Sequence, residues 1–423
     1  MDKTEILAKK ANVVAAELVK PVIVKPTVNE KSFAELVATA DAGYTINKAY
    51  DLGGETVTLP HGVVLTFKGK GKLSNGKIVG DRGVIHADRR IFYNVQVEGT
   101  WDCVGQAHWF VSGCEIGETQ AGVPFVKNYV DDFDGLQDAL DSSFGEIVFS
   151  PLLIFVTETV VLRREKRLTL QGPSLSLGLE SYPEAMRNAT VIFARKDITL
   201  LEIMINDSYN QKSAAIVGGN FDVSLCENYT SSCIKVVSDN DERIWGLQID
   251  TTIHGKYASS GGVGIDINPV ENRKSVGYIT DVRIESNIYS FGIGVKVRDY
   301  CDKATMTYYN WCSDVVIDGC ISHCQVAVDS NADTDIRAMI QSGYFLGMKD
   351  NDAPLVRFSG LWATISSNVY DIGMKGDGGK WSNEYALEVA DEDAMVTVSG
   401  MFEARYNACK KLGWKFVNGK ICN

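Results

Sequence analysis

A short strand pattern recurs in this chain at a nearly fixed step. The segment DVRIESNIYSFGIGVKV (281–297) is followed thirty-three positions later by DVVIDGCISHCQVAVDS (314–330). Asp281 aligns with Asp314, and the apolar positions that follow align as well. A fixed step with two or three short strands in each repeat is typical of a β-solenoid, in which stacked coils bury one continuous apolar core. The repeat therefore constrains the fold more than any other feature.

The same strand occurs a third time. GLQID ends at Asp250, thirty-five residues before the strand that ends at Glu285, and DVVID ends at Asp318. Short apolar alternations continue from about residue 150 to the end with almost no helical pattern, which excludes leucine-rich and ankyrin repeats. The prediction is an all-β chain that folds as a parallel β-helix. An all-β sandwich is the alternative, but it gives no reason for a repeated step.

The N-terminal part of the chain has a different sequence pattern. The apolar spacing of residues 1–20 predicts a helix that ends at Pro21. The prolines of PVIVKPTV (21–28) predict an extended linker. Residues 31–43 predict a second short helix. Short strands separated by Gly and Asn turns then begin at 44. The predicted organisation is a helical anchor and linker segment (1–43), a strand-rich adaptor module (44–125), the β-helix (126–405) and a C-terminal cap (406–423).

Charge and hydropathy narrow the classes of partner. The 423-residue chain has a net charge of −12 and a sequence pI of about 5.0. Nucleic-acid binding needs a basic stripe that this composition does not supply. No apolar run reaches the roughly 18 residues of a membrane helix, so we expect neither nucleic acid nor membrane insertion. The N-terminal twenty residues lack the apolar centre of a signal peptide, which predicts no Sec-type export.

The ten cysteines predict reduced thiols, several of them in the core. The core positions are expected for the cysteines next to apolar strand residues, which are Cys226, Cys312, Cys320 and Cys324. A zinc site at Cys312, Cys320, His323 and Cys324 is the alternative for the densest group, but the spacing fits no finger or ribbon pattern. We therefore expect no metal and no cofactor.

One segment carries a family resemblance. DFDGLQDALDSSFGEIVFSP resembles the opening of pectate-lyase-like right-handed β-helices, with the match running from Asp134 to Pro151. Gly135 replaces a bulkier residue there, and Ser150 stands before the proline. The resemblance implies a right-handed coil with the small helix capping its apolar end. The superfamily includes pectin-active enzymes, polysaccharide hydrolases and the trimeric tail spikes of tailed phages.

The upstream segments LGGETVTLP and GKLSNGKIVG look like β-rich segments in phage and prophage proteins of gut Bacteroidota. These resemblances imply a tail spike or tail fibre, made in the host cytoplasm and carried on the virion. It would form a homotrimer, join other tail proteins through its N-terminal segment and bind host surface polysaccharide. Two alternatives remain: a free-standing polysaccharide hydrolase or lyase, and an extracellular or surface β-helix of a bacterium.

Strand alternation predicts an acidic column on the outside of the solenoid. In the three repeats the apolar residues point inward, so that Asp250, Glu285 and Asp318 point outward. Stacked strands place neighbouring members about 4.8 Å apart at the backbone. Three like charges in one column raise at least one carboxyl pKa, whereas the next strand's column of Asp266, Lys296 and Asp329 alternates in sign.

Paired carboxyls with separated pKa values suit glycosidic bond cleavage, at about 5–5.5 Å for retention and about 6.5–9.5 Å for inversion. Asp250, Glu285 and Asp318 are therefore candidate catalytic residues of a glycoside hydrolase, with a polysaccharide lyase as second choice. Structural strand-end turns and non-catalytic sugar contacts are the competing interpretations. Candidate sugar-packing aromatics are Trp245, Tyr289, Tyr309 and Trp311.

Other chemistries have weaker support. The motifs of polygalacturonases are absent in their required order. A calcium-dependent lyase needs an acid cluster with a basic residue, and Asp281, Asp299 and Arg283 carry no specific signal for it. C-terminal capping is the expectation for Trp414, Phe416 and Cys422.

Overall fold

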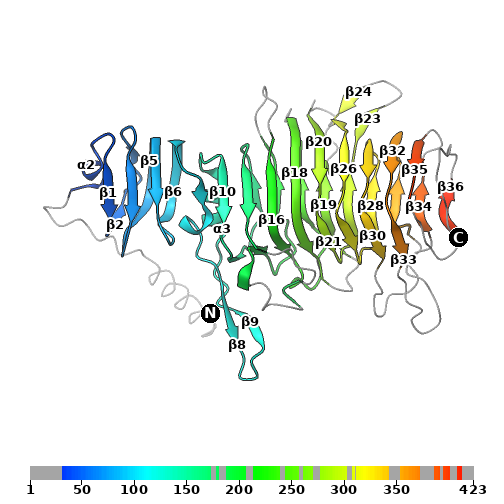
Figure 1. The fold of residues 1–423 in the computed structure, drawn as a ribbon, viewed down its shortest axis with the longest axis horizontal. Helices are drawn as coiled ribbons and strands as arrows, with labels where there is room; N and C mark the ends of the chain where they lie inside the picture. The colour runs from blue at the N-terminus through cyan, green and yellow to red at the C-terminus, as the bar shows by residue number, and fades with distance from the viewer. Residues whose placement is uncertain are drawn as a thin grey trace, which may run out of the picture.

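The computed structural model is an all-β chain built from long sheets of parallel strands (Figure 1). The described residues are 31–172, 178–180, 187–205, 213–238, 243–256, 261–269, 277–302, 307–309, 311–342, 353–371, 385–390, 394–400 and 407–411. The predicted helix and linker at 1–28 lie outside them, as do Trp414, Phe416 and Cys422.

The N-terminal module stacks parallel strands at a short step. Val64 pairs with Gly43, twenty-one residues earlier, and with Val84, twenty residues later. The same short step recurs where Thr56 pairs with Lys77. Its strands are β1 (Gly43–Ile46), β2 (Ala49–Asp51), β3 (Thr56–Thr58), β4 (Val64–Phe67), β5 (Lys72–His86) and β6 (Phe92–Trp101).

The helix predicted over 31–43 is shorter in the structure. Helix α2 covers only Phe33–Leu36, and a capping box between Ser32 and Glu35 closes its first turn. The chain then turns through Asp41, which has a φ of 53°, and β1 begins at Gly43. The helix thus ends six residues before β1, and only Gly43 of the predicted helical segment pairs with β4.

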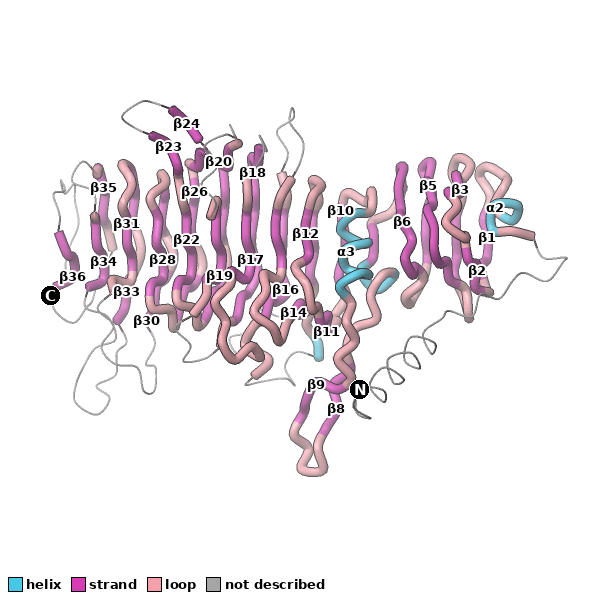
Figure 2. Tube along the Cα trace, turned by 180° about the vertical axis from the view of Figure 1, so that it is seen from behind, coloured by secondary structure: helices cyan, strands magenta, loops and turns pink. Residues whose placement is uncertain are grey.

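A connecting region joins this module to the rest. It contains β7 (Gly105–Gln106), η1 (Ala107–Trp109), a hairpin of β8 (Glu115–Glu118) and β9 (Pro124–Lys127), and α3 (Phe133–Asp141). The hairpin projects from the side of the molecule (Figures 1 and 2). Helix α3 contacts β6 and β12, and it buries Leu136 and Leu140 while Phe133 stays half-buried.

After α3 the chain runs repeatedly through three parallel ladders. The first ladder contains β7, β10 (Glu146–Phe149), β13 (Arg167–Leu170), β16 (Ala215–Asp222), β18 (Arg243–His254), β20 (Tyr278–Ile284), β25 (Trp311–Cys312), β26 (Val315–Ile317), β29 (Thr334–Ile336), β32 (Trp362–Ile365) and β35 (Met395–Val398).

The second ladder shares the long strands β16 and β18, whose C-terminal ends pair with it. Its other strands are β11 (Leu153–Phe155), β14 (Val191–Phe193), β21 (Asn287–Tyr289), β27 (Cys320–Ser322), β30 (Met339–Ser342) and β33 (Val369–Asp371).

The third ladder is a separate sheet of nine strands among the described residues. These are β12 (Val160–Leu162), β15 (Leu201–Ile203), β17 (Ser232–Val236), β19 (Val263–Ile267), β22 (Ile293–Val297), β28 (Val326–Ser330), β31 (Val356–Phe358), β34 (Tyr385–Val389) and β36 (Asn407–Lys411). A short hairpin of β23 (Tyr300–Asp302) and β24 (Thr307–Tyr309) leaves the ladders.

The register agrees with the repeat read from the sequence. Leu247 pairs with Val282, and Val282 pairs with Val315, at the predicted steps of thirty-five and thirty-three. These residues and their counterparts form one core that runs from Phe33 to Val398. Cys226, Cys312 and Cys324 are buried as predicted, but Cys320 is only half-buried on β27.

Candidate functional site

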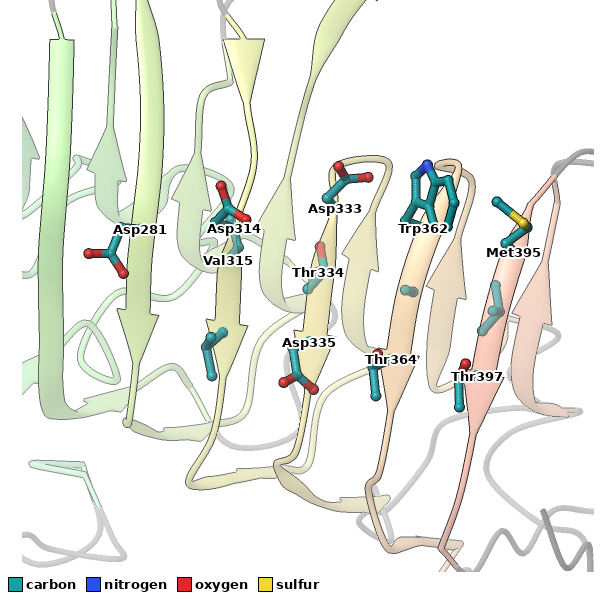
Figure 3. A pocket seen from close by; sticks show the side chains of 13 residues that line it. Asp281, Asp314, Val315, Asp333, Thr334, Asp335, Trp362, Thr364, Met395 and Thr397 are labelled. Atoms are coloured by element: carbon teal, nitrogen blue, oxygen red, sulfur yellow. The ribbon is translucent and has the colours of Figure 1, made fainter. Parts of the chain in front are cut away.

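The outer face of the first ladder carries three rows of side chains that cross its strands. The Asp281 row consists of Asp281, Asp314, Asp333, Trp362 and Met395, one from each of five neighbouring coils. At about 4.8 Å per strand it spans roughly 19 Å. The row begins with three acids and ends with two large apolar side chains (Figure 3).

Two further rows lie toward the strand ends. The Arg283 row consists of Arg283, Val316, Asp335, Thr364 and Thr397. The Asp250 row consists of Asp250, Glu285, Asp318 and Arg337. Strand geometry of about 3.3 Å per residue separates the Asp281 row from the Asp250 row by roughly 13 Å.

A groove of about 570 Å³ follows the first two rows. All five members of the Asp281 row line it, together with Val316, Asp335, Thr364 and Thr397 from the Arg283 row. Figure 3 shows the acids of the Asp281 row at one side of the groove, continuing into Trp362 and Met395. A groove of this volume lies in the range of roughly 300–1,000 Å³ that ligand sites occupy.

The backbone places two acids of this row, Asp281 and Asp314, by an unusual local conformation. Gly246, Asp281 and Asp314 occupy equivalent positions and have φ values of 79°, 53° and 54°. Asp tolerates this left-handed region better than most residues but still pays for it. The conformation interrupts strand alternation just before the inward-pointing Leu247, Val282 and Val315, and the carboxylates stay on the outer face.

Asp314 and Asp281 have different partners among the described residues. The Oδ2 atom of Asp314 accepts hydrogen bonds from the Thr280 hydroxyl at 3.0 Å and from the Ser313 hydroxyl at 2.9 Å. The Oδ1 atom of Asp281 lies 3.8 Å from Nε of Arg283, a long and exposed contact. Asp314 therefore accepts hydrogen bonds from two neutral hydroxyl donors.

Asp335 differs from its neighbours because one of its oxygens is engaged and the other is not. Oδ2 accepts a hydrogen bond from Nε of Arg337 at 2.8 Å. Oδ1 is buried and accepts no hydrogen bond from the described residues. A buried acceptor without a donor costs about 1–3 kcal/mol.

The apolar end of the groove is unusually exposed. Trp362 is 53% exposed and Met395 is 47% exposed, although both lie on strands whose inward residues are buried. A flat exposed indole beside carboxylates is an arrangement that can pack a sugar ring and bind its hydroxyls.

The predicted catalytic acids stand in one outward row, as the strand pattern predicted, and their catalytic role stays a prediction. Burial, and after it the charge of Glu285, raises the pKa of Asp250. The amide of Gln248 donates a hydrogen bond to Oε2 of Glu285 at 3.1 Å. Asp250 and Glu285 therefore form an interacting pair, as the sequence predicted, but burial is the larger cause of the pKa change.

Asp318 departs from that pair. Its carboxylate accepts a hydrogen bond from the backbone N–H of Gly319 at 2.7 Å, the turn contact that the competing interpretation expected. Its other neighbour along the row is Arg337, not a further acid.

The predicted aromatic residues are divided between two places. Tyr278 links Trp245 and Trp311, with ring centroids 6.1 and 6.0 Å away. Tyr278 and Trp311 lie three residues before the Asp281 row, and Trp245 pairs with Thr280, one residue before that row. The cluster therefore lies on the side of the Asp281 row that faces away from the Asp250 row. Tyr289 instead stacks on His254 at 5.4 Å on the second ladder, and the side chain of Tyr309 lies outside the described residues.

The alternating column predicted on the third ladder is longer than expected. The register continues it in both directions from Asp266, Lys296 and Asp329 to Glu202, Lys235, Arg357 and Glu388. Ion pairs join Lys235 to Glu202 at 3.3 Å and Arg357 to Glu388 at 3.5 Å. Arg298 binds Asp329 at 2.7 Å. This face pairs its charges, in contrast with the first ladder.

The residues considered for a calcium-dependent lyase lie on two segments. Asp281 and Arg283 belong to β20, whereas Asp299 follows β22 and accepts a hydrogen bond from the backbone N–H of Cys312, the strand partner of Ile279. No group of three or more His, Cys, Asp or Glu among the described residues has the geometry to hold a metal ion.

The sequence interpretation missed most of the groove. Asp314 was visible as the partner of Asp281 in the repeat, but chemistry was assigned to the acids at the strand ends instead. Asp333, Trp362 and Met395 follow the preceding member of the row after steps of nineteen, twenty-nine and thirty-three residues, so the thirty-three-residue period alone does not align them.

No family model, curated protein or solved structure matches this chain.

Proposed function

We propose that residues 126–405 form a right-handed parallel β-helix that binds polysaccharide on the outer face of its first ladder. Three parallel ladders visited in the same order by successive coils support the coil. Its hand follows from the strong preference of parallel crossovers for right-handed connections. The observation that carries the binding site is the groove in which Asp314 and Asp333 stand in one row with the exposed Trp362.

The groove suits an extended glycan better than a compact ligand. It crosses five neighbouring strands and is open along the outside of the ladder (Figure 3). Sugar rings present apolar faces to aromatic side chains and hydroxyls to carboxylates. A row with a tryptophan at one end and three aspartates at the other offers both kinds of contact along roughly 19 Å.

We further propose the biological setting of a phage tail spike or tail fibre. In this setting the chain is a homotrimer on the virion, its N-terminal segment joins other tail proteins, and host surface polysaccharide is the ligand. The resemblance at 134–151 and the acidic composition support this proposal. A bacterial extracellular or surface location is the alternative. No helix in the described part of the chain is long and apolar enough to cross a bilayer.

A second candidate function is cleavage of the bound glycan by the pair Asp250 and Glu285. Burial and the neighbouring Glu285 raise the pKa of Asp250, which favours a proton donor, and Gln248 holds the Glu285 carboxylate. A hydrolase with this pair, free-standing or on a spike, would protonate the leaving oxygen through Asp250. A polysaccharide lyase is the further alternative.

One experiment separates binding from cleavage. Wild-type protein is screened on an array of bacterial surface glycans, and positive glycans are then assayed for new reducing ends. Binding that Trp362→Ala removes supports the groove, whereas undiminished binding by that variant contradicts it. Loss of reducing-end release in Glu285→Gln, with binding intact, supports the catalytic pair. Release that survives in both Glu285→Gln and Asp250→Asn refutes it.

A further inference from the structure

We propose that the first ladder holds a bound glycan on two tryptophan platforms, Trp245 and Trp362, and therefore selects linear chains of about five or more sugars over shorter ones. This inference rests on the proposed polysaccharide binding at the same face. It follows from where the exposed aromatic side chains lie, how far apart they are along the stack of coils, and which residues separate them.

The exposed large apolar side chains of the three ladders are unevenly distributed. Among the described residues, the first ladder carries Trp245, Trp311, Trp362 and Met395, the second carries Met339, and the third carries none. The three ladders belong to the same coils, so coil stacking itself does not require an exposed indole. Because burial of aromatic surface is favourable, indoles exposed on one face indicate contact with another molecule there.

Trp245 and Trp362 stand at opposite ends of the acids in the Asp281 row. Trp245 pairs with Thr280, the residue before Asp281, and Trp362 follows Asp333 in the row (Figure 3). Four strand steps, from β18 through β20, β26 and β29 to β32, separate the two indoles. At about 4.8 Å per step they lie roughly 19 Å apart along the coil stack. Trp245 thus extends the binding face one coil beyond the groove, whose lining ends at Asp281.

Neighbouring side chains hold Trp245 in place. The ring of Tyr278 lies 6.1 Å from the Trp245 indole with an angle of 77° between the planes, and it lies 6.0 Å from the ring of Trp311 on its other side. The guanidinium of Arg243 packs on the same Tyr278 ring at 5.4 Å. Trp245 is nevertheless 40% exposed. A side chain that is already fixed loses less conformational entropy when a ligand packs on it, so Trp245 is preorganised as a platform.

The separation of the two platforms suits a sugar chain better than a protein surface. Between them the row carries Asp281, Asp314 and Asp333, whereas a protein interface gathers its apolar residues at a centre that is poor in charged ones. A linear glycan instead presents apolar ring faces at intervals, with hydroxyls between them that donate hydrogen bonds to carboxylates.

The same separation sets a minimum length for the glycan. One pyranose residue of an extended chain spans about one strand spacing, roughly 4.8 Å. Rings packed on Trp245 and on Trp362 are then about four residues apart, which a trisaccharide cannot span. Once one ring is packed, the second contact of a longer chain is intramolecular and raises the affinity without a second encounter. Affinity should therefore rise steeply between three and six sugars.

The test uses an array of linear bacterial oligosaccharides in which each sequence is printed at three and at six residues. We expect the full chain to bind hexasaccharides at least about tenfold more tightly than trisaccharides of the same sequence. Calorimetry with the tightest-binding hexasaccharide then gives the dissociation constant for each variant.

Variants test whether the second platform causes the preference for length. Trp245→Ala should weaken hexasaccharide binding at least about tenfold, to near the trisaccharide level, whereas Trp245→Phe keeps an aromatic ring and should retain most of the affinity. Phe125→Ala is the matched control, since Phe125 is 43% exposed outside the three ladders, and it should bind like the wild type. Near-native melting of each variant ensures that lost binding is not lost folding.

The outcomes separate the two proposals. Trisaccharides that bind as tightly as hexasaccharides, or hexasaccharide binding that Trp245→Ala leaves unchanged, overturn the inference; the proposed function survives if Trp362→Ala still weakens binding. If Trp245→Ala lowers the native mass in light scattering and leaves glycan binding intact, Trp245 is a contact between copies of the chain and the inference is wrong. If no member of the array binds, the proposed function fails together with the inference.

Discussion

The outer faces of the first and third ladders differ in the order of the charged side chains that stack across their strands. On the third ladder, charges alternate from Glu202 to Glu388 and neighbouring members form ion pairs. On the first ladder, Asp281, Asp314 and Asp333 follow one another without alternation. Both faces belong to the same coils, so coil stacking itself does not require like charges.

This difference in charge order indicates which rows stabilise the fold and which rows are candidates for binding. Alternating charges lower the energy of a ladder, and like charges directly opposite raise it. Asp266 and Asp329 are only 5% and 6% exposed, so their ion pairs belong to the packed structure. The aspartates of the Asp281 row instead border an open groove. A row that costs stability and faces a groove is a candidate for binding.

The largest expected effect comes from breaking the alternation. Lys296→Glu places three acids in succession on the third ladder, two of them buried. We expect it to lower the free energy of unfolding by about 2–4 kcal/mol, since an unpaired buried charge is costly. Denaturant unfolding measures this. The matched change on the first ladder, Asp318→Lys beside Glu285, should cost less than about 0.5 kcal/mol; equal losses would remove the distinction between the faces.

A smaller effect concerns binding and not stability. Trp362→Ala should weaken glycan binding at least about tenfold, or about 1.4 kcal/mol, while the melting temperature stays near that of the wild type because half of the indole is exposed. Phe125→Ala is the matched control, as Phe125 is 43% exposed on the projecting β8–β9 hairpin. Equal binding by both variants would argue against the first-ladder face.

The smallest effect lies in the Asp250 row. Glu285 contributes to the raised pKa of Asp250, so Asp250 binds its proton more tightly in the folded chain than in the unfolded chain. This contribution to stability is present at low pH and is lost as pH rises through the folded pKa. Glu285→Gln should make the loss of unfolding free energy with rising pH smaller by less than about 1 kcal/mol, because the site is largely exposed.

Stability measured across the acidic range checks this prediction. The matched variant on the third ladder is Glu202→Gln, which breaks the ion pair with Lys235 and should lower stability at neutral pH. A loss of stability at neutral pH in Glu285→Gln would mean that Glu285 is stabilising and that the two faces do not differ there.

The sequence predicted the strand register of the central repeats well because these repeats are nearly equal in length. The steps from Leu247 to Val282 and from Val282 to Val315 match the register. The alternation around Val282 and Ile284 assigned inward and outward faces correctly, since both are buried while Arg283 and Glu285 are exposed. The helix and strand at 133–149 also agree with their pattern.

The groove was harder to predict for physical reasons. Turn lengths between coils vary, so Val315 pairs with Thr334 after only nineteen residues, and no fixed period aligns Asp333 with Asp314. The left-handed conformation of Asp281 and Asp314 also interrupts simple alternation. In the N-terminal module, repeats of about twenty residues stack in parallel. The sequence pattern there predicted short strands and turns but not the repeat.

A crystal structure of the chain with the tightest-binding glycan tests the central claim most directly. The account predicts sugar rings packed on Trp362, with hydroxyl groups within hydrogen-bond distance of Asp314 and Asp333. A glycan bound on the third ladder or on the N-terminal module, with the groove empty, would contradict it.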